Sequence, residues 1–263
     1  MWCQQQIGKI MTMRYSGQNN LFYDKFHKES SIQAKVISKD NFTYRNAIKL
    51  FGENIKKTSG LKILDFGCGV GTLSLYFAAC NNNVIGVDVS KRAISLARRS
   101  AKRMGIDSFT EFEVLSEWKH LLYKNKFDVA VSIEVIEHVS DDAEVLSILF
   151  SCIRHGGKLI LSTPSVNAPL YKLGLVEEFD KRVGHLRRYS INELVKKMKS
   201  AGFKVEEVRR TEGVVRNSLF LFPLLGKFVR FIKGPISGIV TFIDNITIPL
   251  FGESNLYVVA TKI

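Results

Sequence analysis

The sequence predicts an α/β fold in which helices cover both faces of a mostly parallel sheet. Short apolar runs alternate with amphipathic helical patterns through the middle of the chain, an order typical of parallel sheets. A glycine-rich turn at 67–71 directly follows the first apolar run. The 263 residues, 46% of them hydrophobic, are enough for one domain with insertions.

The stretch before the first strand is expected to be mainly helical. Residues 1–20 are rich in Gln and Asn and show little periodicity, so we expect them to be poorly ordered. Apolar residues at mixed helical spacing from Leu21 to Ile55 predict two or three helices. We therefore divide the chain into a helical extension or lid, 1–58, and a main domain, 59–263.

The first strand and the turn after it are the centre of the predicted domain. A buried strand at 62–66 runs into Gly67, Gly69 and Gly71, and a helix at 72–80 follows. Glycines let the backbone turn tightly and approach a ligand without Cβ clashes. The free N–H groups at the start of the helix then point toward whatever the loop holds.

The later elements are marked by capping and stop signals. Ser90 is a good N-cap, Gly105 ends the helix that Ser90 opens, and Ser190 with Glu193 forms a capping box. Residues 165–189 are expected to form a long functional loop. We expect strands at 84–88, 110–115, 127–133, 158–163, 203–208 and 256–260, and helices at 91–104, 142–153 and 190–201, with a turn at 155–157.

Two acidic residues accompany the glycine turn. Asp88 ends the second strand, 21 residues after Gly67, where a carboxylate accepts hydrogen bonds from ribose hydroxyls. Asp65 lies two residues before Gly67, and its charge would repel a pyrophosphate but attract a sulfonium or amino group. Thr72 stands where a dinucleotide fingerprint needs its third glycine. The pattern therefore favours a cationic cofactor over a nicotinamide dinucleotide.

Four segments together resemble the S-adenosylmethionine (SAM)-dependent methyltransferases of the Rossmann-like class. They are ILDFGCGVGT at 63–72, VIGVDVS at 84–90, FDVAVSIEVIEHV at 127–139 and GGKLILSTP at 156–164. The resemblance implies a seven-stranded sheet whose last strand runs antiparallel, with SAM over the glycine loop. The cofactor-binding residues that it implies are Asp65, Gly67, Cys68, Gly69, Asp88, Val89, Leu115, Ser116 and Ile133.

A second group of polar residues follows the fourth strand. Glu134, Glu137 and His138 would share one face if this turn were helical. Two carboxylates and an imidazole can bind a hard divalent cation or serve as a general base. His185 lies in a segment that leads back toward the same sheet edge. We take His138, Glu134 and His185 as candidate catalytic residues.

This ExxEH pattern with a distant histidine is similar to that of two methyltransferase subfamilies. These are the ubiquinone-biosynthesis O-methyltransferases and the small-RNA 2′-O-methyltransferases. The second resemblance implies Mg²⁺ held by Glu134, Glu137, His138 and His185. Two other interpretations stay open, a base or substrate-positioning role for His138 and an EH pair that only orders the turn. Arg187, Arg188 and Tyr189 either bind an anionic substrate group or face solvent and cap the next helix.

An unusually long apolar insertion, 211–254, separates the last two strands. Its central part, 214–252, carries Lys227, Arg230 and Lys233 among the apolar residues, too many charges for a membrane-spanning helix. The composition suits a helix lying in a membrane interface, a lid over an apolar substrate or a dimer face. Ordinary packing on the sheet is the fourth interpretation.

Charge and cysteine content bound the setting of the protein. The net charge of +13 fits solvated helix faces, an anionic membrane surface, an anionic substrate or nucleic acid. Four scattered cysteines without a CxxC pair predict reduced thiols in a cytoplasmic protein without a zinc site. The N-terminus lacks the order of a signal peptide.

We therefore expect a SAM-dependent methyltransferase that acts on a small-molecule or lipid-linked acceptor, at an oxygen. One rival is an RNA 2′-O-methyltransferase, which the charge and the ExxEH pattern favour, although the sequence has no evident RNA-binding domain. Another is a catalytically silent SAM-fold partner subunit, against which the glycine loop and Asp88 argue. A nicotinamide oxidoreductase is disfavoured by Asp65. The pattern says nothing of the oligomeric state.

Overall fold

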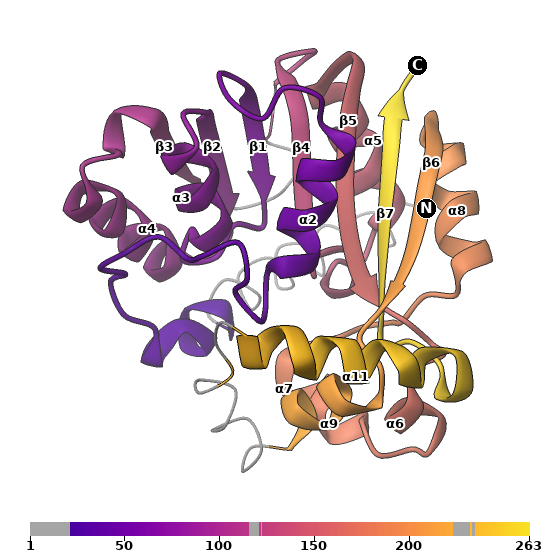
Figure 1. Ribbon diagram of the computed structural model, residues 1–263. Coiled ribbons are helices and arrows are strands. Elements are labelled where there is room, and N and C mark those ends of the chain that lie inside the picture. The colour runs from indigo at the N-terminus through magenta and orange to yellow at the C-terminus, as the bar shows by residue number, and fades with distance from the viewer. Residues whose placement is uncertain (1–21, 116–120, 122, 223–231, 233–234) are drawn as a thin grey trace, which may run out of the picture.

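A seven-stranded sheet forms the middle layer of the molecule, with helices on both of its faces (Figure 1). The computed structural model describes residues 22–115, 121, 123–222, 232 and 235–263. The strand order is β3-β2-β1-β4-β5-β7-β6, in which β7 runs antiparallel to both of its neighbours and the other pairs are parallel. The predicted α/β, Rossmann-like class and its antiparallel last strand are confirmed.

The elements alternate along the chain as the sequence predicted. The strands are β1 (Lys62–Phe66), β2 (Asn83–Asp88), β3 (Thr110–Val114), β4 (Phe127–Ile133), β5 (Ile153–Pro164), β6 (Phe203–Thr211) and β7 (Asn255–Lys262). The helices are α2 (Arg45–Asn54), α3 (Thr72–Ala79), α4 (Lys91–Met104), α5 (Asp142–Cys152), α6 (Pro169–Lys172), α7 (Glu177–Val183), α8 (Ile191–Ser200), α9 (Val214–Leu221) and α11 (Pro235–Phe251), with 3-10 turns η1 (His27–Glu29), η2 (Asp107–Phe109) and η4 (Ile136–His138).

The central strands are apolar on both faces because helices cover both faces. Successive side chains of a strand point to opposite sides, and in β1 this divides the core into two parts. Ile63 packs on the side of α2 and α3, whereas Leu64 packs on the side of α5 and α8. Both side chains are fully buried. The two faces of the sheet are therefore covered by helices, and the edge at which the parallel strands end is available for a binding site.

The predicted helix caps are confirmed. The Ser90 hydroxyl accepts a hydrogen bond from Ala93 N–H, and Gly105 ends α4 in the left-handed conformation. The Ser190 hydroxyl likewise accepts from Glu193 N–H at the start of α8. These local signals need no tertiary context, because each is a short-range bond between a side chain and the backbone.

Two predicted boundaries were wrong. The long loop expected at 165–189 contains α6 and α7, of which α6 begins with Pro169 and α7 ends at the left-handed Gly184. The strand expected at 158–163 begins at Ile153, because the turn at 155–157 is an irregularity inside β5. Short helices and bulges of this kind have weak sequence signals.

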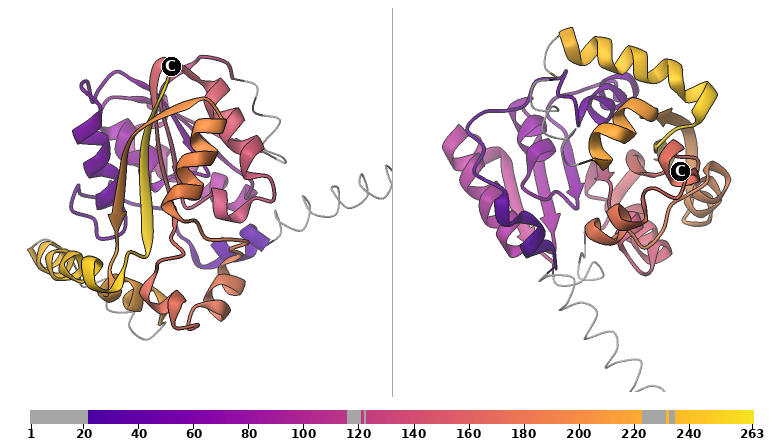
Figure 2. Two further views of the ribbon diagram at one scale, coloured as in Figure 1. Left: turned by 90° about the vertical axis from the view of Figure 1, so that its right-hand side faces the viewer. Right: turned by 90° about the horizontal axis from the view of Figure 1, so that it is seen from below.

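The described part of the apolar insertion forms two packed helices below the ends of the last strands. α9 and α11 pack on each other, and α11 lies across the end of the sheet (Figures 1 and 2). Within the described residues, no helix combines the length and apolar character needed to cross a bilayer. The expectation for residues 1–20 lies outside the described residues.

Candidate active site

The glycine loop is held tightly against the end of β2. The N–H groups of Gly67 and Cys68 both donate to Val87 O, at 2.8 and 3.0 Å. Gly67 has φ +77°, and a Cβ at this position would lie 2.3 Å from Val135 Cγ2. Gly69 has φ +53°. A side chain at Gly67 would therefore both strain the backbone and collide with the turn after β4.

Asp88 joins the loop to the start of α4. One carboxylate oxygen accepts from Gly69 N–H at 2.9 Å and the other from Ser90 N–H at 2.8 Å. Burial raises the pKa of Asp88, and these backbone hydrogen bonds oppose that shift. The loop and the helix start thus fix the carboxylate at the rim of the sheet, while its remaining lone pairs can still accept hydroxyl groups.

A cavity of about 530 Å³ begins at this loop and continues past the end of β4. The far part is lined mainly by apolar and aromatic side chains from α7, α9 and β7. Of the residues predicted to bind cofactor or to act in catalysis, the cavity is lined by Gly67, Gly69, Asp88, Val89, Ile133, Glu134, His138 and His185. The structure therefore brings the two predicted groups of site residues into one space.

Three predicted cofactor residues do not line this cavity. The Asp65 side chain is 3% exposed, and its carboxylate accepts a 2.5 Å hydrogen bond from the Ser74 hydroxyl of α3. The Asp65 carboxylate is therefore engaged by a hydrogen bond within the protein, and the expected contact between Asp65 and a sulfonium is not supported. Cys68 and Leu115 pack among apolar core residues. Ser116 lies outside the described residues.

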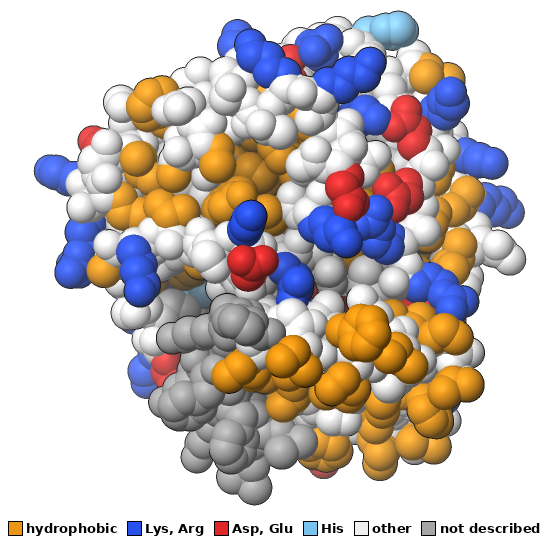
Figure 3. Space-filling model, viewed as in Figure 1, with side chains coloured by type: hydrophobic (Ala, Val, Ile, Leu, Met, Phe, Trp, Pro, Cys, Tyr) orange, Lys and Arg blue, Asp and Glu red, His pale blue; other side chains and the backbone are white. Residues whose placement is uncertain are grey.

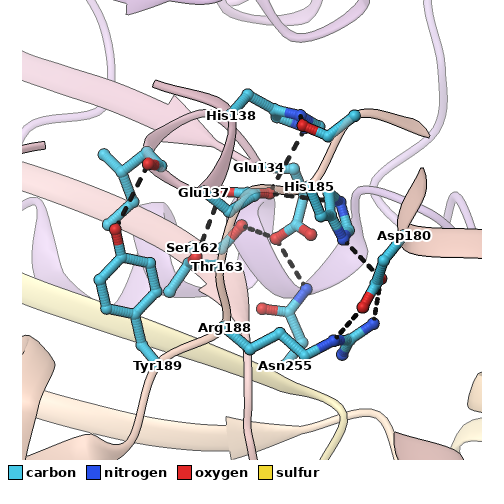
Figure 4. Close-up of polar contacts among 12 residues, drawn as sticks. Glu134, Glu137, His138, Ser162, Thr163, Asp180, His185, Arg188, Tyr189 and Asn255 are labelled. Atoms are coloured by element: carbon cyan, nitrogen blue, oxygen red, sulfur yellow. Dashed lines mark hydrogen bonds and ion pairs between the residues drawn. The ribbon is translucent and has the colours of Figure 1, made fainter. Parts of the chain in front are cut away.

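The turn after β4 is not the helix that the ExxEH spacing suggested. Glu134 has φ +57°, and only Ile136–His138 forms a 3-10 turn. The left-handed residue turns the Glu134 side chain toward the sheet, where it accepts from Ser162 Oγ at 2.7 Å and from Asn255 Nδ2 at 2.8 Å (Figure 4). The prediction that Glu134 shares a face with Glu137 and His138 was wrong.

Glu137, His138 and His185 converge on one point (Figure 4). Glu137 Oε1 lies 3.7 Å from His138 Nε2 and 3.9 Å from His185 Nε2. The other carboxylate oxygen accepts from Thr163 Oγ1 at 3.1 Å. Glu137 is fully buried, and its Oε1 has no hydrogen-bond partner among the described residues. Three of the four predicted metal ligands thus meet, whereas the Glu134 carboxylate is engaged by Ser162 and Asn255.

The outer nitrogen atoms of the two histidines fix their tautomers. His138 Nδ1 lies 3.0 Å from Gly184 O, and His185 Nδ1 lies 2.9 Å from Asp180 Oδ1. Carbonyl and carboxylate oxygens only accept, so each ring carries a hydrogen on Nδ1. The Nε2 atoms of both rings face the Glu137 carboxylate, and the three atoms together form a place for a proton or a cation.

Burial shifts the pKa values of Glu137 and His138 in opposite directions. It raises the pKa of Glu137 well above the usual range, with the nearby Glu134 carboxylate as a second cause. It lowers the pKa of His138 to about 4, assisted by His185. His138 is therefore a neutral imidazole at physiological pH, with a free acceptor atom facing the cavity end of β4.

The arginines of the segment before α8 are engaged within the protein. Arg188 donates two hydrogen bonds to Asp180, at 2.8 and 2.6 Å, and so orients the carboxylate that holds His185. Arg187 lies 3.1 Å from Asp142, and the Tyr189 hydroxyl donates to the same carboxylate at 2.6 Å. An anion-binding role for this trio is not supported by these contacts.

Residues 22–29 lie within the segment that we expected to form an extension or lid, and we call them the N-terminal cover; the sequence analysis did not single out which of its residues reach the cavity. Tyr23 and His27 line the cavity, and the Tyr23 ring packs edge-on to His138 with ring centroids 5.8 Å apart. Asp24 anchors the cover to α4 by accepting from Ser90 Oγ at 2.6 Å. The aromatic residues of this stretch look like ordinary helix packing in the sequence, so no local signal marked them.

A family model described as a methyltransferase domain matches residues 39–208. Among curated proteins, a ubiquinone biosynthesis O-methyltransferase from Leptothrix cholodnii is 31% identical over 124 residues, which cover 47% of this chain and 53% of the relative. The enzyme of the same description from Thiobacillus denitrificans is 33% identical over 119 residues, which cover 45% and 50%. The chain thus spans about half the length of the curated relatives it matches.

Solved structures agree with this fold. The [4+2]-cyclase SpnF superposes with a TM-score of 0.65 at 18% identity, covering 94% of this chain and 96% of the other. A geranyl diphosphate C-methyltransferase from Streptomyces coelicolor, solved with Mg²⁺, geranyl diphosphate and S-adenosyl-L-homocysteine, gives 0.65 at 12% identity, covering 95% and 98%. At these identities the likeness concerns the fold alone.

Proposed function

The chain belongs to the methyltransferase-domain family, and from this premise we propose that it is an enzyme that transfers the methyl group of SAM to an acceptor oxygen. One observation carries the proposal. A single cavity runs from the glycine loop and Asp88 to the neutral His138 at the end of β4. A methyl donor bound at the first end would therefore face an acceptor held at the second.

The residues at the loop end fit SAM. Gly67 and Gly69 line the cavity with their backbone, and Asp88 is fixed where a ribose needs two acceptors. Val89 and Ile133 supply apolar walls to this part of the cavity. When bound there, SAM supplies an electrophilic methyl group on a sulfonium.

The far end fits a largely apolar acceptor that carries a hydroxyl group. Phe179, Phe220 and Leu221 line this end, which suits a small aromatic or lipid-linked molecule. His138 Nε2 is positioned to accept the hydrogen of the acceptor hydroxyl and so to direct the oxygen lone pair toward the donor. Methyl transfer is an in-line displacement, and holding the two reactants in line supplies much of its acceleration.

We also propose that Glu137, His138 and His185 hold a divalent metal ion. The support is the convergence of one carboxylate oxygen and two imidazole lone pairs, each histidine being oriented by a hydrogen bond at Nδ1. Two nitrogen ligands suit Zn²⁺, Mn²⁺ or Fe²⁺ better than Mg²⁺, which prefers oxygen. A metal bound there would take the Nε2 lone pair of His138, so that the metal, as a Lewis acid that lowers the pKa of the acceptor hydroxyl, would act in place of the imidazole.

The rival functions differ in what the cavity must accept. The apolar far wall and the N-terminal cover suit a small acceptor better than a nucleotide within an RNA strand. The glycine loop with Asp88 intact argues against a silent partner subunit. The engagement of Asp65 by Ser74 removes its charge as an argument against a dinucleotide, so the case for SAM rests on the family and on the form of the loop.

Methyl transfer from labelled SAM tests the proposed reaction. Lipid, small-molecule and RNA fractions of a cell extract are incubated with the full chain, with Asp88→Ala and with the charge-matched surface control Glu111→Ala. We expect label in the lipid or small-molecule fraction with the wild type and with Glu111→Ala, and at least about ten-fold less with Asp88→Ala at a SAM concentration below its dissociation constant. Label confined to RNA would establish the rival enzyme, and label in no fraction would overturn the proposal.

Thermal unfolding with added metals tests the proposed ion site without using activity. After treatment with a chelator, Zn²⁺ or Mn²⁺ should raise the melting temperature of the full chain more than Mg²⁺ does. The rise should vanish in His185→Ala and persist in His155→Ala, which removes an exposed histidine. An equal rise in both variants, or none in the wild type, would reject the site.

A further inference from the structure

Helix α11 turns most of its apolar side chains toward solvent and several polar side chains toward the protein. Three of its polar residues face the domain: Ser237 and Asp244 are fully buried, and Thr241 is nearly so, whereas Asn245 is exposed. Ile248 is buried, whereas seven large apolar residues face solvent, each of them half exposed or more. They are Ile236, Ile239, Phe242, Ile243, Ile246, Leu250 and Phe251, which we call the α11 face.

Hydrogen bonds fix α11 in this orientation. The Asp244 carboxylate accepts from Gly213 N–H at 2.8 Å and from Arg216 N–H at 2.9 Å, at the start of α9. Arg45 of α2 donates to Ser237 O and to Thr241 Oγ1, both at 2.8 Å. Rolling the helix to bury its apolar side would leave these polar groups without partners, at a cost of about 1–3 kcal/mol each. The outward direction of the α11 face is therefore built into the fold.

The α11 face forms part of an apolar end of the molecule. A helix on the surface of a soluble domain normally turns its apolar side inward, and a contiguous exposed apolar patch marks an interaction surface. The space-filling view shows this patch along α11 (Figure 3). Tyr171, Leu173 and Leu175 of α6 and its following turn are also exposed at this end (Figure 1).

Charge indicates what covers the α11 face. The buried Asp244 is the only charged residue within α11. In the sequence between α9 and α11 the only charged residues are Lys227, Arg230 and Lys233, and the whole chain carries +13. Two copies of such a chain repel each other, whereas the surface of an anionic bilayer attracts one.

We propose that the α11 face docks on an anionic membrane surface, with the helix lying in the plane of the interface. The apolar side chains enter the boundary between headgroups and acyl chains, and the net positive charge of the chain draws it to the anionic headgroups. The cavity shares its Phe220 and Leu221 walls with α9, which packs on α11. The far end of the cavity thus lies on the side of the molecule that would face the membrane. The docking is independent of which reaction the cavity supports.

Co-sedimentation with sucrose-loaded vesicles tests the proposal. The full chain is mixed either with phosphatidylcholine vesicles or with vesicles that also contain about 30% phosphatidylglycerol. This anionic lipid gives the vesicles a negative surface potential. We expect the chain to pellet at least about ten-fold more with the anionic vesicles, and less as salt rises. The triple variant Ile239→Gln/Phe242→Gln/Ile246→Gln should lose this binding.

The control is Phe109→Gln/Ile263→Gln, which changes two exposed apolar residues far from α11 and should pellet like the wild type. Circular dichroism shows that each variant is folded, and analytical ultracentrifugation gives its oligomeric state. Failure of the wild type to pellet, or equal pelleting of the triple variant, would overturn the proposal. A wild-type dimer that the triple variant converts to a monomer would do so as well, because a second copy would then cover the face.

Discussion

At the scale of single residues, Asp65 makes folding depend on pH. Burial raises the pKa of its carboxyl to about 6, against an ordinary value of 3.8. Between about pH 4 and pH 6 the folded state thus binds more protons than the unfolded state, so the free energy of unfolding falls as pH rises. The total decrease in the free energy of unfolding that Asp65 causes is on the order of 3 kcal/mol, and it is complete above about pH 6.

The variant Asp65→Asn tests this effect, because an amide keeps an oxygen that can accept from Ser74 but does not ionise. We expect its free energy of unfolding to fall less between pH 5 and pH 7 than that of the wild type. Urea unfolding at the two pH values measures the difference. Identical pH dependence in the two proteins would show that Asp65 is not the group responsible.

A comparison of Gly67 with Gly156 tests how tightly the glycine loop is packed. Both have positive φ, +77° and +73°, so alanine strains the backbone equally at each. At Gly67 the new Cβ would also meet Val135 Cγ2 at 2.3 Å, whereas at Gly156 nothing lies within 4 Å. We expect Gly67→Ala to lower the free energy of unfolding by about 1–3 kcal/mol more than Gly156→Ala does. Urea unfolding measures this, and equal losses would contradict the tight contact.

Residues of the site were easiest to predict where their roles are local, whereas His185 came from the family resemblance. Asp88 follows from its place at a strand end, and His138 from its position just after β4. Asp65 could not be assigned from its charge, because only the fold reveals that Ser74 engages the carboxylate. Glu134 could not be placed either, since its left-handed conformation, unusual for a side chain of this type, depends on the contacts with Ser162 and Asn255.

At the scale of elements, the N-terminal cover links the two ends of the cavity. Tyr23 reaches His138, and His27 lies beside Gly69, while Asp24 accepts from Ser90 Oγ and from Arg92 N–H. The cover is thus held chiefly at the start of α4, where a carboxylate also meets the positive end of the helix dipole.

Removing this anchor should loosen the cover. We expect Asp24→Ala to raise the dissociation rate of SAM by about three- to ten-fold, because such changes act mostly on dissociation. Stopped-flow displacement measures the rate. Glu29→Ala, an exposed acid in the same segment, should leave it unchanged. A wild-type rate in Asp24→Ala would mean that the cover does not retain the cofactor.

Regular elements were the easiest to predict, and irregular ones the hardest. α4 and α8 carry caps, amphipathic spacing and stop signals within their own sequences. α6 has four residues and α7 has seven, too few for a clear periodicity. α6 also contacts the distant α9, where Leu170 N–H donates to Asn217 Oδ1.

At the scale of the whole molecule, the sheet places two chemistries side by side. Parallel strands β1, β2 and β4 end at one edge, so the turns after them carry Gly67, Asp88 and His138 into a single cavity. The alternation of elements predicted a parallel sheet and the family resemblance implied the antiparallel β7, but the strand order came only from the structure. Periodicity alone does not tell which strand lies beside which.

Isothermal titration with SAM tests the central claim, that this cavity binds the methyl donor at the glycine loop. We predict that one SAM binds per chain, and that Asp88→Ala weakens binding by at least about ten-fold, since hydrogen bonds to a charged group are worth about 1.5–3 kcal/mol. Glu111→Ala should bind as the wild type does, and NAD should give no heat. Absence of binding by SAM, or binding of NAD in its place, would contradict the account.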